Sequence, residues 1–207
     1  MKVWILIFVC MFSMPLLVAV LHFRMRKGQI LKIRQDYVKN ARYFGRSFSA
    51  LVEKALPEMK NGMIMLSRQE KVLETDGKQE FVQPEIEDLI IARNTIFCPQ
   101  QEDLHFQKEI YSEKDALFVK ENIRLRAVYS KKRLLFGNKI RLLRWADAEH
   151  AVAVYDECDL GERVSSGEQL VIGFENVFHS LYAPVIRLGQ RPEEPDRFME
   201  ERDPRIF

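Results

Sequence analysis

Residues 110–127 read IYSEKDALFVKENIRLRA, and this stretch decides the fold because its pattern recurs along the chain. Three further stretches align with it: VYSKKRLLFGNKIRLLR from Val128, WADAEHAVAVYDECDLGER from Trp145 and VSSGEQLVIGFENVFHSL from Val164. A fifth begins at Tyr182 with YAPVIRLG, so the five starts are 18, 17, 19 and 18 residues apart. An internal period of this length indicates stacked structural repeats.

Each repeat places short apolar runs between polar residues. Ala116–Val119 is one such run, and Ile123 with Leu125 adds a further apolar site in the first repeat. Three short strands in about eighteen residues are typical of one turn of a parallel β-helix, whose inward apolar side chains stack into a continuous core. The sequence therefore predicts a mainly β protein, with a parallel β-helix of about five coils over residues 85–189. A degenerate earlier copy is expected from Ile91, and turns are expected at Gly137, Gly161, Gly173 and Gly189.

A β-sandwich is the alternative fold, because its strands also recur every 8–12 residues or so. The repeats contain no Asn-Gly or Asp-Gly pair of the kind that closes a two-residue hairpin. The spacing near eighteen residues also persists through four steps, which favours the β-helix.

An apolar stretch precedes the repeats. Residues 3–23 read VWILIFVCMFSMPLLVAVLHF and contain no Asp, Glu, Lys or Arg, which suits one helix across a bilayer. We therefore expect a transmembrane helix over residues 1–23, with Val3, Trp4, Pro15 and Phe23 in the anchor. A cleaved signal peptide is the alternative, but the apolar run is longer than usual and no A-x-A-like site follows it.

Positive charge follows the apolar stretch. Lys2 carries +1, residues 24–60 carry a net charge of +7 and residues 61–207 carry −6, so the total of +2 is an average over unlike segments. An excess of Lys and Arg marks the cytoplasmic flank, so we expect a single-pass protein of the cytoplasmic membrane with its carboxyl-terminal domain in the cytoplasm. Anionic headgroups of the inner leaflet are the expected partners of Arg24, Arg26, Lys27, Lys32 and Arg34. Nucleic acid is not expected as a partner, because the basic charge is confined to this segment.

Residues 24–60 are expected to form a basic, amphipathic juxtamembrane helix. Apolar side chains recur at helical spacing from Ile30 to Ala55, and Pro57 supplies a stop. This helix could lie along the inner leaflet or pack its aromatic stripe on the following domain. Residues 61–84 are expected to be a transition, and residues 190–207 a charged, disordered tail.

The coil spacing and apolar pattern of residues 85–190 resemble those of the bactofilins, bacterial cytoskeletal proteins that form polymers. The resemblance implies a cytoplasmic β-helix that assembles without nucleotide, coil end to coil end, and serves in scaffolding or cell shape. The chain departs from that pattern in its apolar amino-terminal stretch, its long basic helix and its few, irregular coils.

The sequence therefore favours a membrane-anchored bacterial scaffold protein over an enzyme. Solenoid ends expose unpaired backbone and apolar core, so self-association is expected at Val185, Ile186 and Leu188, with other protein partners unidentified. The alternative is a β-helix enzyme, acyltransferase-like or carbohydrate-active, whose general base would come from His105, His150 or His179. No catalytic residue, cofactor or metal is assigned, because Walker, G-x-G-x-x-G and H-E-x-x-H signatures are missing and the acidic run Asp156–Asp159 lacks calcium-loop spacing.

Overall fold

The computed structural model describes residues 40–75 and 78–192, together with positions 4, 11–15, 17, 18, 20 and 21. The chain divides into two units, residues 1–35 and residues 36–207. The described positions of the first unit are helical. Among the residues that the structure describes, no helix is long and apolar enough to cross a membrane. Most of the predicted span, and all of residues 22–39, lie outside those residues.

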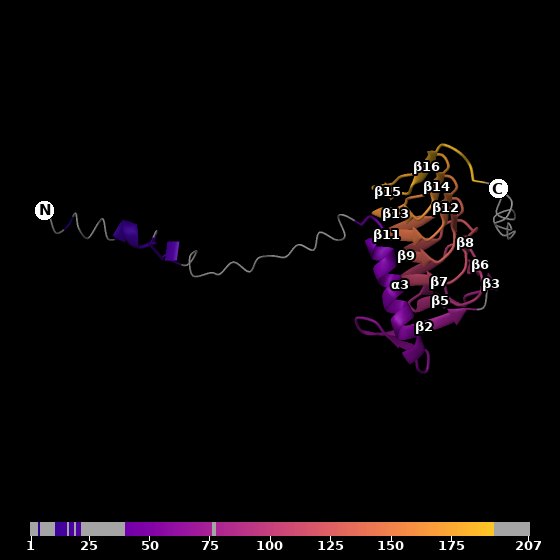
Figure 1. Ribbon diagram of the computed structural model, residues 1–207, viewed down its shortest axis with the longest axis horizontal. Coiled ribbons are helices and arrows are strands. Elements are labelled where there is room, and N and C mark those ends of the chain that lie inside the picture. The colour runs from indigo at the N-terminus through magenta and orange to yellow at the C-terminus, as the bar shows by residue number, and fades with distance from the viewer. Residues whose placement is uncertain are drawn as a thin grey trace. The chain divides into compact units, whose positions relative to one another are not determined.

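The second unit is a solenoid of about six turns, built mainly from parallel strands (Figure 1). One sheet contains, in spatial order, β1 (Met63–Met65), β2 (Gln69–Thr75), β5 (Leu89–Ala92), β7 (His105–Ser112), β9 (Arg124–Ser130), β11 (Arg141–Ala148), β13 (Arg163–Ser166) and β15 (Leu181–Tyr182), and β4 (Glu85–Ile86) also pairs with β7. The second sheet contains β8 (Ala116–Phe118), β10 (Leu134–Phe136), β12 (Ala151–Val154), β14 (Gln169–Ile172) and β16 (Val185–Leu188). A short third sheet pairs β3 (Lys78–Gln79) with β6 (Cys98–Pro99). The parallel pairing confirms the predicted solenoid and excludes the antiparallel β-sandwich.

The register of the strands refines the repeat that the sequence suggests. One column of partners, each paired with the next, runs through Ile110, Val128, Ala146, Val164 and Leu181. Ala146 therefore takes the place in this column that the sequence alignment gave to Trp145. Strand β11 carries an extra residue against β9 between Leu142 and Trp145. Because side chains alternate between faces, a one-residue shift decides which residue enters the core. Tyr182 and Ile91 are displaced by one residue in the same way, since Leu181 and Ile90 occupy the inward position.

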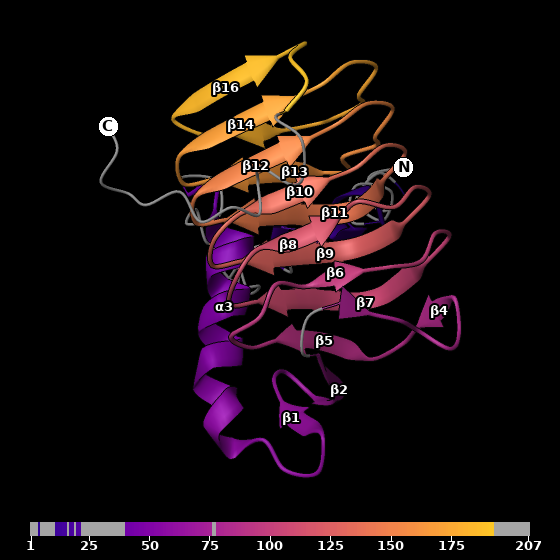
Figure 2. The same cartoon turned by 90° about the vertical axis from the view of Figure 1, so that its right-hand side faces the viewer.

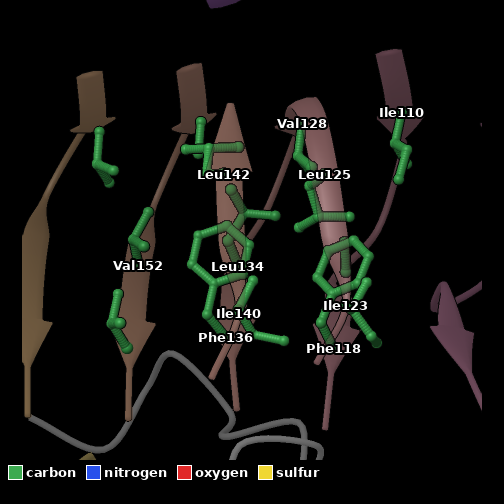
Figure 3. Packing of buried hydrophobic residues seen from close by; sticks show 14 of the residues in the cluster. Ile110, Phe118, Ile123, Leu125, Val128, Leu134, Phe136, Ile140, Leu142 and Val152 are labelled. Carbon is green, nitrogen blue, oxygen red and sulfur yellow. The ribbon is translucent and has the colours of Figure 1, made fainter. Parts of the chain in front are cut away.

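The core consists of columns of inward side chains, one residue from each turn. Phe118 lies beside Phe136, with ring centroids 5.8 Å apart, and both are fully buried. Ile123 and Ile140 form part of a neighbouring column, and Figure 3 shows these columns side by side. Cys158 continues the pattern one turn later at 1% exposure. Burial raises the pKa of its thiol to about 12, so it behaves as a small apolar core residue.

Helix α3 (Tyr43–Ala55) lies against the outer face of the first sheet, over β9 and β11 (Figures 1 and 2). A 3₁₀ turn, η1 (Leu56–Glu58), follows it at Pro57. The buried face of the helix contains Gly45, Ser49, Val52 and Ala55. The expected apolar stripe is only partly buried: Phe48 packs on Tyr111 and Trp145 of the sheet, whereas Phe44 and Leu51 are exposed. Among the described residues, the helix thus packs on the domain, which was one of its two expected positions.

Gly45 explains how the helix comes so close to the sheet. A Cβ at this position would overlap the side chain of Asp147 on β11. The glycine that weakens the helical pattern in the sequence is therefore the residue that permits the contact.

Candidate functional site

The predicted self-association end lies on β16, the last strand of the second sheet. Val185, Ile186 and Leu188 are 46%, 41% and 56% exposed. Ile186 stacks on Leu170, and Leu188 stacks on Ile172. Those two residues of the preceding turn are almost fully buried, at 0% and 1% exposure. The last turn therefore covers the core of its neighbour and leaves its own core side uncovered.

The exposed apolar surface extends over the whole last turn. Beyond β16, four more large apolar side chains of this turn are exposed: Phe174, Val177, Phe178 and Tyr182. Strands β15 and β16 are the outermost strands of their sheets within the described part of the chain (Figure 1). An edge strand presents unpaired backbone donors and acceptors, so this end has both the apolar area and the hydrogen-bonding groups of an association surface.

The opposite end of the solenoid is finished differently. Strand β1 pairs antiparallel with β2 and so breaks the parallel stacking. The ring of Phe81 packs edge-to-face on Phe106 at a centroid distance of 5.4 Å, against the first full turns of the core. Ile64 of β1 is 1% exposed and packs under α3 with Val52.

A second candidate site is a groove along what we call the third side of the solenoid. On this side the chain leaves the second sheet, for example at β8 and β10, and turns into the first sheet at β9 and β11. This hollow has a volume of about 590 Å³. Its lining includes residues in the left-handed region of backbone space from successive turns, with φ between 56° and 59°: Asp103, Asn122, Lys139 and Glu157. The repeated corner conformation places one polar side chain per turn in the groove.

Three basic residues share one register position beside these corners. His105 pairs with Arg124, and Arg124 pairs with Arg141. All three also line a second hollow of about 440 Å³ that adjoins the first. Within residues 40–75 and 78–192, no hydrogen bond or ion pair is formed by the side chain of Arg124 or Arg141. The groove therefore contains two arginines at neighbouring register positions without a carboxylate partner among the described residues.

Acidic and amide groups line the rest of the groove. They are Glu85, Asp103, Asn122 and Glu157. Lys139, the remaining cation, is already paired with Glu121 at 2.8 Å. Asp159 follows Arg141 in register, and its carboxylate accepts a hydrogen bond from the backbone N–H of Gly161.

The other histidines and the acidic run have ordinary surroundings. His150 contacts the exposed carboxylate of Glu168 at 2.6 Å, and His179 is exposed. Of the three candidate bases, His105 alone lines the groove. Asp156 accepts hydrogen bonds from the backbone of Phe174 and from Arg191. No group of three or more His, Cys, Asp or Glu side chains that could hold a metal is found among the described residues.

A buried ion-pair network joins α3 to the sheet, and the sequence pattern did not reveal it. The guanidinium of Arg42 donates to Asp147 at 2.8 Å and 3.1 Å, and also to Glu149 and to the carbonyl oxygen of Ala148. Arg42 and Asp147 are 5% and 1% exposed. Burial alone would raise the pKa of Glu149, but the hydrogen bond and charge of Arg42 outweigh burial and lower it. Ser165 adds a hydrogen bond to Asp147 at 2.7 Å.

The predicted membrane residues fall almost entirely outside the described part of the chain. Trp4 and Pro15 of the anchor are described, are helical and are exposed. Val3 and Phe23 lie outside, as do Arg24, Arg26, Lys27, Lys32 and Arg34. Comparison with known proteins found no family model, curated protein or solved structure that matches this chain.

Proposed function

We propose that this chain is a membrane-tethered scaffold protein that self-associates through the last turn of its solenoid. The observation that carries the proposal is the exposure of Ile186 and Leu188, which stand at core positions of the stack, with Val185 exposed beside them. A second copy offers the same chemistry that the preceding turns offer each other: an apolar column flanked by two strand edges. The resemblance to bactofilins in coil spacing also supports assembly at a coil end.

The difference between the two ends favours a closed dimer over a filament. A filament that joins the last turn of one copy to the first turn of the next needs complementary ends. In the longer sheet the first turn is finished by the antiparallel strand β1, so this end offers no parallel edge there to match β15, and Phe81 covers the core beside it. Two copies that meet at their last turns form a two-fold contact, which closes after two subunits.

The tether is supported by the sequence. Residues 3–23 are predominantly apolar, and the following segment is basic, which is the pattern of a membrane anchor followed by a cytoplasmic domain. A dimer of anchored solenoids would hold two membrane attachments together and present two lateral surfaces to further partners. This arrangement suits a scaffold, because it needs no catalytic group and no cofactor.

Sedimentation equilibrium of the detergent-solubilised full chain tests self-association. We expect a monomer–dimer equilibrium for the wild type and a shift towards monomer for the double variant Ile186→Glu/Leu188→Glu. The matched control is Leu51→Glu, which alters an apolar residue of similar exposure (49%) on the outer face of α3. A wild type that stays monomeric at high concentration would refute the proposal, as would equal dissociation of both variants.

The tail provides a further arm of the same experiment. Residues 193–207 follow the last turn, so they are an alternative occupant of its surface. If a chain that ends at Pro192 dimerises while the full chain does not, the tail and not a second copy covers the last turn. Recovery of the chain in the membrane fraction, and its release when residues 1–23 are deleted, tests the tether separately.

A further inference from the structure

The groove on the third side of the solenoid contains an unrelieved pair of positive charges. Arg124 and Arg141 are direct register neighbours in adjacent parallel strands, which lie about 4.8 Å apart. Both side chains are exposed, and neither forms an ion pair with any described residue. Like charges directly opposite each other in a sheet are destabilising. His105 adds a third basic side chain at the same register position.

Other cations of the solenoid show the usual way to relieve such charge. Arg126 pairs with Glu109, Arg133 with Asp115 and Lys139 with Glu121, each across one turn of the stack. Two carboxylates near the arginine pair serve other partners: Glu85 accepts from Gln107, and Asp159 from the backbone of Gly161. Asp103 and Glu157 also line the groove, but neither forms an ion pair with Arg124 or Arg141. An oxyanion from outside the chain would fit between the two guanidinium groups, since each presents several N–H donors in a planar fork.

The other residues that line the groove restrict the class of ligand that could carry this anionic group. The hollow of about 590 Å³ is much larger than one carboxylate or phosphate, so it has room for the body of a small ligand. Glu85, Asp103 and Glu157 would repel further negative charge, but their oxygens accept hydrogen bonds from hydroxyl groups. Asn122 both donates and accepts. The groove therefore suits a ligand with one anionic group and several hydroxyls.

We propose that this groove binds an acidic saccharide, with the carboxylate of a uronic acid held by Arg124 and Arg141 and its neutral neighbours facing Asp103, Asn122 and Glu157. The proposal concerns binding and includes no covalent step. It is independent of self-association, because the groove lies on the side of the solenoid and its lining contains no residue of β15 or β16.

Isothermal titration of the full chain tests the proposal. The chain is kept in a polyoxyethylene detergent, because detergents with sugar headgroups would compete for the site. The probes are a disaccharide of one glucuronate and one neutral sugar, a neutral disaccharide of the same size, trigalacturonate and inorganic phosphate. We expect the glucuronate disaccharide to bind at least about tenfold more tightly than each of the other three probes. The neutral disaccharide lacks the charge-assisted contact, the groove carboxylates repel the further charges of trigalacturonate, and phosphate lacks the sugar hydroxyls.

Variants identify the site. Arg124→Gln/Arg141→Gln should weaken binding of the glucuronate disaccharide at least about tenfold, and Arg124→Lys/Arg141→Lys should fall between this variant and the wild type. The matched control is Arg187→Gln, an exposed arginine on β16 outside both hollows, which should leave affinity unchanged within about twofold. An unfolding temperature no lower than that of the wild type would show that the glutamine variant is folded. Phosphate bound as tightly as the acidic disaccharide, equal binding of the neutral disaccharide, binding retained by the glutamine variant, or no binding of any probe would each overturn the proposal.

Discussion

The first and last turns of the solenoid end the same stacked core in opposite ways. At the first end, the antiparallel strand β1 breaks the parallel stacking with its Ile64 buried under helix α3, and the ring of Phe81 packs on Phe106 of the core. At the last end, Ile186 and Leu188 occupy core positions and remain exposed. The comparison shows that burial in this fold depends on the next turn more than on the residue itself. A terminal turn without a cap therefore either lowers the stability of the fold or serves as an interface with another molecule.

The largest expected effect compares the stability lost when two residues of one core column, one inside the stack and one in the last turn, are changed to alanine. Phe136 and Leu188 belong to the same column, three turns apart, yet one is fully buried and the other is 56% exposed. We expect Phe136→Ala to lower the free energy of unfolding by about 3–5 kcal/mol, because it leaves a cavity. Leu188→Ala should cost about 1 kcal/mol or less in the monomer, since most of its surface is already in water. Chemical denaturation of dilute protein measures both, and equal losses would contradict the open last turn.

The next test concerns the face of the first sheet that helix α3 covers. Arg42→Ala leaves the carboxylate of Asp147 buried without its ion-pair partner, so we expect a loss of about 3–5 kcal/mol. The double variant Arg42→Ala/Asp147→Ala should lose less than Arg42→Ala alone, because no buried charge is left unpaired. Thermal or chemical unfolding of the three proteins makes the comparison. A double variant less stable than Arg42→Ala would show that the network itself holds α3 on the sheet.

A smaller effect is expected from pH at the edge of the same network. The folded-state pKa of Glu149 lies below its ordinary value near 4.5, despite burial, because of Arg42. Its stabilising contribution is therefore full above pH 4.5 and is lost as pH falls through the lowered pKa. Since Glu149 is one-third exposed, we expect only about 0.5 kcal/mol. Unfolding curves of wild type and Glu149→Gln below pH 4.5 should converge, and a gap that widens with acid would contradict the account.

The sequence predicted the solenoid because its signals are local and repeated. The spacing of 17–19 residues and the apolar runs sufficed to place most strands, including the exposed end at Val185–Leu188. The register at Ala146 was missed, since an extra residue in β11 shifts the pattern while bulky Trp145 resembles a core residue. Trp145 is buried from the other side, in the cluster under α3.

The two polar features needed the register before they became visible. Arg42 and Asp147 are 105 residues apart, and no local pattern joins them. The signal for the groove was present, because His105, Arg124 and Arg141 recur at 19 and 17 residues, the length of a turn. Recurrence of basic residues at coil spacing could have found it, had polar positions been aligned as the apolar ones were.

The distance between matching ends of two copies tests the central claim most directly. Spin labels are attached at Arg187→Cys in the last turn or at Val82→Cys, a fully exposed site near the first turns, in a chain whose Cys10 is replaced by alanine. About six turns at about 4.8 Å give each solenoid a length of roughly 30 Å. A dimer joined at its last turns should give Arg187→Cys labels within about 25 Å of each other and Val82→Cys labels roughly 60 Å apart. Short distances at Val82→Cys, or no dipolar coupling at either site, would contradict the account.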